Sequence, residues 1–292
     1  KNLQILTDMQ VEKLVLRDGR VVQVVATSKG HNITLGVARE VVLSAGAIGS
    51  AHILMTSGIG AGKELAKWGI PVERDLPGVG QNLQDHLQAR PIFKTNLSTI
   101  NTEVKSWIRK TMMGIEYALR RTGPMTMAAS LGTGFLKTHP DLETPDIQFH
   151  IQPFSANNAV EGTHPFSAFT TSVLQLRPES QGFLKLKSAD SRIYPAIHPN
   201  YLATTKDQTT IVKGIQIARK IASFDPLKSH ITEEYAPGRD IAFDDEAGTL
   251  EWARNTSVTI YHPTGTCKMG NDPMSVVDAR LQVHGVRGLR VA

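Results

Sequence analysis

The stretch from Val41 to Gly58 constrains the fold of this chain more than any other feature. Val41 to Leu43 is continuously apolar, as is typical of a strand buried on both faces. Four small residues follow, and the pattern then predicts a helix from about Ile48 to Thr56, with Gly58 as its left-handed cap. A buried strand, small residues and then a helix is how a doubly wound sheet brings its backbone close to a ligand. The sequence therefore predicts an α/β fold.

The rest of the chain alternates between strand and helix signals. The Asp18-Gly19 pair between two β-branched runs predicts a hairpin. Apolar spacing predicts three further helices, and alternation predicts an antiparallel pair of strands. The expected strands are 3–6, 11–16, 21–26, 33–37, 41–43 and the pair 169–176 and 183–186, and the further helices are 104–120, 207–222 and 245–255.

Composition narrows the class of protein. The chain has 292 residues, of which 40% are hydrophobic and 20% charged, so a globular protein of one large or two ordinary domains is expected. The net charge of +5 comes from scattered Lys and Arg, which argues against a nucleic-acid partner. No apolar run reaches the roughly 20 residues of a transmembrane helix. The single cysteine, Cys267, excludes an internal disulfide and a Cys-x-x-Cys metal site.

Motifs of several other enzyme classes are missing. Gly58 to Lys63 approaches a phosphate-binding loop, but Ser57 stands where the loop needs its first glycine, and Glu64 stands where it needs Ser or Thr. No Gly-x-Ser-x-Gly nucleophile elbow occurs. No two histidines have the His-x-x-x-His spacing of a helical metal site. We therefore expect no NTPase, hydrolase or metal chemistry.

Three long segments resemble the glucose–methanol–choline (GMC) oxidoreductases, and they occur in that family's order. The first, from Val41 to Gly60, is similar to the second signature of the family. The second is Leu76-Pro-Gly-Val-Gly-Gln-Asn-Leu-Gln-Asp-His86. The third is Tyr261-His-Pro-Thr-Gly-Thr-Cys-Lys-Met-Gly270 with 276–292, and it resembles the C-terminal catalytic stretch. The branch it resembles most is that of the bacterial choline dehydrogenases.

The resemblance implies an alcohol as substrate and FAD as cofactor. In the family a histidine accepts the hydroxyl proton while hydride passes to flavin N5, and the matching residue is His262. An alkoxide is a better hydride donor than an alcohol, and imidazole, with an ordinary pKa of about 6.5, accepts a proton at neutral pH. The resemblance also implies a substrate contact at Tyr261 and cofactor contacts at Val11, Ala45, Gly46 and Asn82.

A structural role is the alternative for each of these residues. A strand valine such as Val11 is a core residue by default, and Ala45-Gly46 also suits close packing of a helix on a strand. Core packing is an equal alternative for Tyr261. For the segment 82–86, capping of a helix–loop junction is preferred over a flavin contact. Without its surrounding motif, His262 would be read as a turn residue before a proline.

The resemblance also predicts how the chain divides. Residues 1–90 and 256–292 are expected to form part of an FAD-binding, doubly wound domain, and residues 91–255 an antiparallel-sheet substrate-binding domain. The family's Gly-x-Gly-x-x-Gly fingerprint and first signature are missing, and its second catalytic His or Asn would fall beyond Ala292. Both ends run through expected strands. We therefore expect a fragment that does not hold FAD tightly by itself.

The function predicted from the sequence is FAD-dependent oxidation of an alcohol to an aldehyde or ketone. Two alternatives remain open: an FAD-containing hydroxynitrile lyase of the same family, and a fragment with no catalysis of its own. The expected partners are a small-molecule alcohol and an electron acceptor, either oxygen or a quinone. We expect a cytoplasmic location, with peripheral attachment to a membrane as the open alternative.

Overall fold

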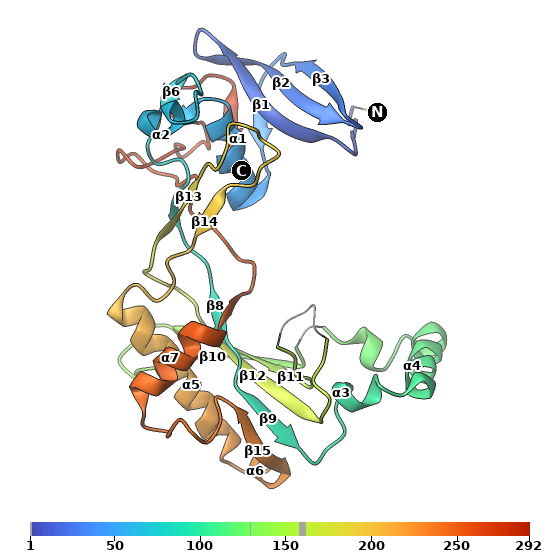
Figure 1. The fold of residues 1–292 in the computed structure, drawn as a ribbon. Coiled ribbons are helices and arrows are strands. Elements are labelled where there is room, and N and C mark those ends of the chain that lie inside the picture. Colours follow the sequence, from blue (N-terminus) through green and yellow to red (C-terminus); the bar gives the residue numbers. More distant parts are fainter. Residues whose placement is uncertain (1, 129, 158–161) are drawn as a thin grey trace. The chain divides into compact units, whose positions relative to one another are not determined.

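The chain forms two compact units, each assembled from segments far apart in sequence (Figure 1). The computed structural model describes residues 2–128, 130–157 and 162–292. Unit 1 contains the described residues of 1–85, 180–201 and 262–292, and unit 2 those of 86–179 and 202–261. Both units mix helices with sheet, which confirms the predicted α/β class.

Unit 1 contains two antiparallel sheets and two short parallel pairs. One sheet has the order β1-β2-β3 and the other β14-β13-β7, while β4 pairs with β17 and β5 with β6 in parallel. Its elements are β1 (Gln10–Arg17), β2 (Arg20–Ser28), β3 (His31–Gly36), β4 (Val41–Leu43), α1 (Gly46–Thr56), β5 (Ile59–Gly60), α2 (Gly62–Ala66), β6 (Arg74–Asp75), β7 (Gln81–Leu83), β13 (Gly182–Lys185), β14 (Ala196–His198) and β17 (Leu289–Val291).

Local signals account for the first half of unit 1. Asp18 and Gly19 both have positive φ, and Arg17 pairs with Arg20, so the predicted hairpin is confirmed. The helix expected near Ile48–Thr56 is α1, and Gly58, at φ +80°, follows its C-cap. Ser57 Oγ accepts a hydrogen bond of 2.8 Å from the backbone N–H of Leu14, which joins the end of α1 to β1.

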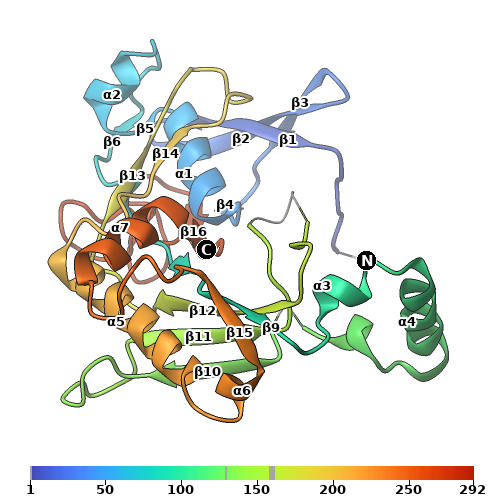
Figure 2. The ribbon, with the colours of Figure 1, turned by 60° about the horizontal axis from the view of Figure 1, so that its bottom comes forward.

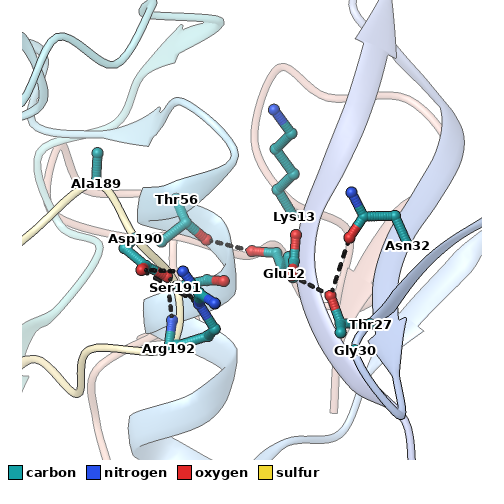
Figure 3. A pocket seen from close by; sticks show the side chains of 10 residues that line it. All are labelled: Glu12, Lys13, Thr27, Gly30, Asn32, Thr56, Ala189, Asp190, Ser191 and Arg192. Carbon is teal, nitrogen blue, oxygen red and sulfur yellow. Dashed lines mark hydrogen bonds and ion pairs between the residues drawn. The ribbon is translucent and has the colours of Figure 1, made fainter.

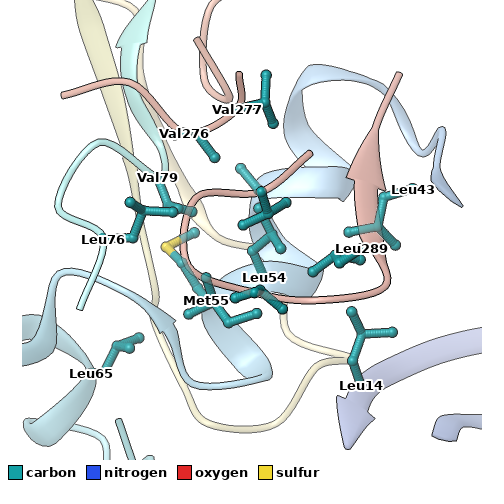
Figure 4. Close-up of a cluster of buried hydrophobic side chains, with 14 of the residues drawn as sticks. Leu14, Leu43, Leu54, Met55, Leu65, Leu76, Val79, Val276, Val277 and Leu289 are labelled. Carbon is teal, nitrogen blue, oxygen red and sulfur yellow. The ribbon is translucent and has the colours of Figure 1, made fainter. Parts of the chain in front are cut away.

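The core of unit 1 surrounds α1 (Figure 4). Leu54 is fully buried in it, and side chains from the hairpin, α2 and the C-terminal segment pack in the same cluster. Leu14, Leu65 and Leu289 each have at most 3% of their surface exposed. Burial of these side chains holds together segments that are far apart in the chain.

Unit 2 is built on a seven-stranded sheet. Its path is β10-β11-β12-β8-β16, with β9 pairing with both β12 and β15. Its elements are β8 (Leu87–Ala89), β9 (Ile92–Thr95), α3 (Ile100–Glu103), α4 (Trp107–Arg120), the 3₁₀ turn η1 (Pro124–Thr126), β10 (Gly132–Leu136), β11 (Ile147–Gln152), β12 (Ala168–Gln175), α5 (Thr205–Ala222), α6 (Leu227–His230), β15 (Ile231–Ala236), α7 (Glu246–Thr256) and β16 (Val258–Thr259).

Helix α5 lies against this sheet (Figure 2). The face predicted from its apolar spacing, Ile211, Ile215, Ala218 and Ala222, is buried throughout. Thr204 caps the helix by accepting a hydrogen bond of 3.2 Å from the backbone N–H of Asp207. This helix therefore follows from local sequence, with a capping residue and one apolar face.

Strand β4 differs from its prediction. Val42 is 50% exposed, although the sequence predicted a strand buried on both faces. Among the residues that the structure describes, β4 pairs with β17 alone, so one edge of the strand carries no neighbour. The prediction of a strand at 3–6 is also wrong. That segment is exposed and lies outside the sheets of the described chain.

Long-range pairing corrects two further predictions. The segments 169–176 and 183–186 do not pair with each other: β12 pairs with β11, β8 and β9, whereas β13 pairs with β14 and β7. Residues 180–201 consequently belong to unit 1 rather than to the middle segment. Residues 86–90 and 256–261 belong to unit 2, where β8 pairs with both β12 and β16. The functions assigned to the domains stay predictions.

The helix expected over 104–120 is α4, which begins three residues later, at Trp107. Ser106 is its N-cap, because its Oγ accepts a hydrogen bond from the backbone N–H of Arg109. In the part of the chain that the structure describes, no helix is long and apolar enough to cross a membrane.

We expect Leu54→Ala to lower the free energy of unfolding of the protein by about 2–5 kcal/mol, because it opens a cavity in the core of unit 1. Leu35→Ala is the matched control: it makes the same substitution on a side chain that is 39% exposed, and it should cost less than about 1 kcal/mol. Urea unfolding of both variants measures the difference. Equal losses would contradict the assigned core.

Candidate active site

The segment that carries His262 is held in unit 1 by the segment just before Asp85. Gln84 and Thr264 exchange two backbone hydrogen bonds, of 3.0 and 2.8 Å, as a short antiparallel bridge. The backbone N–H of Gly80 donates to the carbonyl of Thr266 over 2.9 Å. The structure thus places two of the three segments that resemble the GMC family side by side, about 180 residues apart in sequence.

Asp85 organises this arrangement through a buried carboxylate. Only 8% of Asp85 is exposed. Its Oδ1 accepts a hydrogen bond of 3.0 Å from the backbone N–H of His262, and its Oδ2 accepts one from the Tyr201 hydroxyl. A carboxylate leaves water at low cost only when such donors replace its hydration. Asp85 therefore sets the position of the His262 backbone.

Asn82 reaches the same segment from β7. Its side-chain amide donates a hydrogen bond of 3.3 Å to the carbonyl of Gly265, and its own backbone is left-handed at φ +60°. A Cβ at Gly265 would lie 2.2 Å from the Asn82 carbonyl oxygen. Only glycine permits this close approach, which explains why residue 265 is a glycine.

The His262 segment also contacts the start of α1. The Thr266 hydroxyl donates a hydrogen bond to the carbonyl of Ala47. Ala45 and Gly46, which come between β4 and the body of α1, are exposed, and a Cβ at Gly46 would meet nothing within 4 Å. Asn82 bonds to the His262 segment at Gly265, and the start of α1 bonds to it at Thr266.

No side chain of the first turn of α1 neutralises the positive end of its helix dipole. Ala45 is the N-cap and makes no side-chain cap hydrogen bond, and the first turn contains no acidic residue. Such a helix start presents backbone N–H groups and the positive end of the helix dipole. It lies at the carboxyl end of β4, where ligands bind to parallel sheets.

Cys267 is next to this cluster but is not a nucleophile. It packs partly buried against the core of unit 1. Burial raises the pKa of its thiol to about 12, against which the hydrogen bond with Thr266 is a smaller effect. The thiol is therefore protonated at neutral pH, whereas thiol chemistry requires the thiolate.

Val11 lies elsewhere in unit 1. It is partly buried in β1, whose neighbouring residue Glu12 accepts a hydrogen bond of 2.8 Å at its carbonyl from Thr56, at the far end of α1 from Gly46. Beside it is a polar pocket of about 420 Å³ (Figure 3). Two of its charged groups bond to each other: Arg192 pairs with Asp190 at 2.6 Å and lowers the pKa of that carboxyl to about 2.

Tyr261 and His86, which lie in sequence at the boundaries between the two units, belong to unit 2. Tyr261 is 83% exposed, so it is not the core residue that one interpretation allowed. The Nε2 atom of His86 lies 3.0 Å from the Leu176 carbonyl oxygen.

The capping role preferred for 82–86 is wrong, because these residues lie in β7 and in the segment leading to β8 rather than at a helix end.

The sequence analysis missed two residues of the cluster. Tyr201 is 116 residues from Asp85, and no motif marks it. Thr266 was part of the quoted motif, but nothing in the sequence distinguished it as the contact to Ala47. Among the described residues, no group of three or more His, Cys, Asp and Glu is arranged to hold a metal ion.

Comparisons with known proteins identify the family of the chain. Two sequence models, both described as GMC oxidoreductase, match residues 1–88 and 178–292. The chain is 36% identical over 293 residues to an alcohol dehydrogenase [acceptor] of Pseudomonas putida, covering 99% of this chain and 53% of the relative. It is 37% identical over 293 residues to the mitochondrial choline dehydrogenase of Mus musculus, with 99% and 49% covered.

A solved structure shows the same fold. Formate oxidase of Aspergillus oryzae RIB40 superposes with a TM-score of 0.88 at 23% identity, covering 97% of this chain and 55% of that protein. The chain belongs to the GMC oxidoreductase family. It spans about half the length of the curated relatives it matches.

We expect Asp85→Ala to lower the free energy of unfolding by about 1.5–3 kcal/mol, because it removes a buried charged acceptor from two hydrogen-bond donors. Asp85→Asn keeps an oxygen acceptor for the His262 N–H and should cost less than Asp85→Ala. The surface variant Asp190→Ala controls for loss of a carboxylate. Equal unfolding midpoints in urea for the wild type and Asp85→Ala would refute the role.

Proposed function

We propose that the natural protein carrying this chain oxidises an alcohol, with FAD as its cofactor and His262 as the proton acceptor. The observation that carries this proposal is the cluster in unit 1 that joins Asp85, His262 and the start of α1 within the two segments matched by the family. The names of the relatives support it, since one is an alcohol dehydrogenase and another a choline dehydrogenase. The formate oxidase with the same fold is a protein whose FAD is modified.

The start of α1 fits the cofactor chemically. Ala45 and Gly46 leave open space at an exposed turn, and the uncapped first turn of α1 suits a polar or anionic group. Asn82 belongs to the same bonded cluster. These three residues would hold FAD, which when bound would supply the acceptor for a hydride. The assignment of Val11 to the cofactor stays a prediction.

The protein itself supplies the base and its position. The His262 residue is exposed, while its backbone N–H is anchored on Asp85, so the imidazole can meet a substrate while its backbone stays in place. A neutral imidazole nitrogen would take the proton from the substrate hydroxyl, which raises the electron density on the carbinol oxygen. Tyr261, which precedes it in sequence and is exposed, is the proposed substrate contact.

The comparisons favour oxidation over the lyase alternative, since the relatives described above are dehydrogenases and an oxidase. The particular alcohol, the electron acceptor (oxygen or a quinone) and the cytoplasmic location remain predictions. The chain spans about half the length of these relatives, so the activity is proposed for the natural protein that carries it.

We expect His262→Ala in the natural protein to slow flavin reduction by alcohol by about 10²–10⁴-fold, the usual effect of losing a positioned general base. Flavin content should stay near that of the wild type. His31→Ala, which removes an exposed imidazole from β3 of the same unit, should leave the rate unchanged. Anaerobic rapid mixing with alcohol measures the rate, and reduction of His262→Ala at the wild-type rate would exclude the role.

We expect Gly46→Val to lower the FAD content of the purified natural protein, because a branched side chain would fill the open space beside α1. Gly69→Val is the control for backbone strain: Gly69 has φ +67° against +72° for Gly46, and its Cβ would also meet nothing within 4 Å. The ratio of flavin absorbance to protein absorbance measures occupancy. Equal occupancy in the two variants would contradict the cofactor contact.

A further inference from the structure

Arg90 comes directly after β8, on the face of the unit 2 sheet that α5 does not cover. Helix α5 packs on the other face (Figure 2), where a Cβ at Gly214 would lie 2.7 Å from Cγ2 of Val173. Ala89 pairs with Val173, so its side chain is on the α5 face. Its two neighbours in sequence, Gln88 and Arg90, therefore have their side chains on the opposite face. The Nε of Arg90 donates a hydrogen bond of 3.0 Å to Gln88 Oε1, as this shared face requires.

The segment that leads to Tyr261 runs beside β8. Val258 in β16 pairs with Gln88, three residues before Tyr261. Burial lowers the pKa of the Arg90 guanidinium, and the electrostatic interaction with the Tyr261 side chain is a smaller effect that raises it. The strand pairing and this interaction together put the guanidinium near Tyr261, the residue that precedes His262 in sequence.

The charge of Arg90 has no counter-ion in the described part of the chain. This is a contrast to Arg192, Arg219 and Arg290, each of which pairs with a carboxylate at 2.6–2.9 Å. An arginine side chain stays protonated in proteins, and one that is partly buried has lost part of its hydration. An anion that reached this guanidinium would replace the lost hydration with charge-assisted hydrogen bonds.

The geometry of the free donors suits a carboxylate. The bond to Gln88 uses Nε of Arg90, which leaves the two terminal nitrogens of the guanidinium for a ligand. These nitrogens form a planar fork that matches the two oxygens of a carboxylate. Tyr261 is 83% exposed, so a molecule that contacts its side chain can also reach the guanidinium.

We propose that Arg90 binds a carboxylate of the alcohol that the natural protein oxidises. The inference rests on the proposed oxidation at His262 and adds the class of substrate, an alcohol that carries an acidic group away from its carbinol carbon. An alcohol with a quaternary ammonium group would meet a like charge at Arg90, which is unfavourable. Arg90 is therefore proposed to determine specificity and takes no part in the transfer of the proton or the hydride.

A pair of matched alcohols tests the proposal in the natural protein. The ω-hydroxyhexanoate anion and its methyl ester share one carbinol group and differ in the charge at the other end. We expect kcat/KM for the acid to exceed that for the ester by about tenfold or more, the usual worth of a hydrogen bond to a charged group. Arg90→Gln should abolish this preference through KM, and Arg90→Lys, which keeps the charge without the fork, should retain part of it.

Arg254→Gln is the matched control. Arg254 lies in α7, which contacts α5, the helix on the opposite face of the sheet, and its side chain is 46% exposed. This variant should keep the preference for the acid. A preference that survives Arg90→Gln would overturn the proposal. Equal slowing of acid and ester by Arg90→Gln would also overturn it, because the arginine would then only position Tyr261.

Calorimetric titration with hexanoate separates binding from the reaction, since hexanoate has the carboxylate but no hydroxyl to oxidise. We expect Arg90→Gln to bind hexanoate about tenfold or more weakly than the wild type. If neither alcohol reduces the flavin, the proposed oxidation is contradicted, whereas hexanoate binding that depends on Arg90 would still support the anion site. Equal binding of hexanoate by both proteins would overturn the proposal. Loss of FAD from Arg90→Gln would overturn it too, because the guanidinium would then hold the cofactor.

Discussion

The carboxylate of Asp85 is the interaction on which the arrangement of unit 1 depends. It accepts hydrogen bonds from the backbone of His262 and from the hydroxyl of Tyr201, so that it joins three different segments of the chain. A buried carboxylate without donors would be very unfavourable, so the burial of Asp85 requires both partners to be in place. The backbone bridge between Gln84 and Thr264 extends the same contact.

This constraint explains how the side chain that we propose as the base can lie on a loop and still be positioned. Loops carry function when a rigid scaffold holds them. Here the scaffold is α1, with Leu54 and its neighbours packed around it, and the Thr266 contact to Ala47 joins the loop to it. His262 remains exposed while its backbone is held, which is the arrangement that the proposed proton transfer from a substrate to its imidazole requires.

Much of the local structure could be predicted because it depends on near neighbours. The Asp18-Gly19 hairpin, α1 with Gly58 after its C-cap, and the apolar face of α5 follow from turn chemistry, capping and periodicity. The errors concern partners at a distance. The segment 3–6 lies outside the sheets of the described chain, Val42 is exposed, and β12 and β13 belong to different units, because strand pairing depends on segments that no local pattern identifies.

The sequence by itself determined the α/β class, the family resemblance and the residues that carry it, including His262, because these follow from residue types at short spacing. The tertiary structure decided which of those residues meet. It brought Asp85 to His262 and Tyr201, and Asn82 to Gly265, and it left Val11 near the opposite end of α1 from Gly46. It also left the apolar side chains of α4 exposed, namely Ile108, Met112, Ile115 and Leu119. The physical reason is that burial and hydrogen bonding between distant segments are properties of the folded chain as a whole.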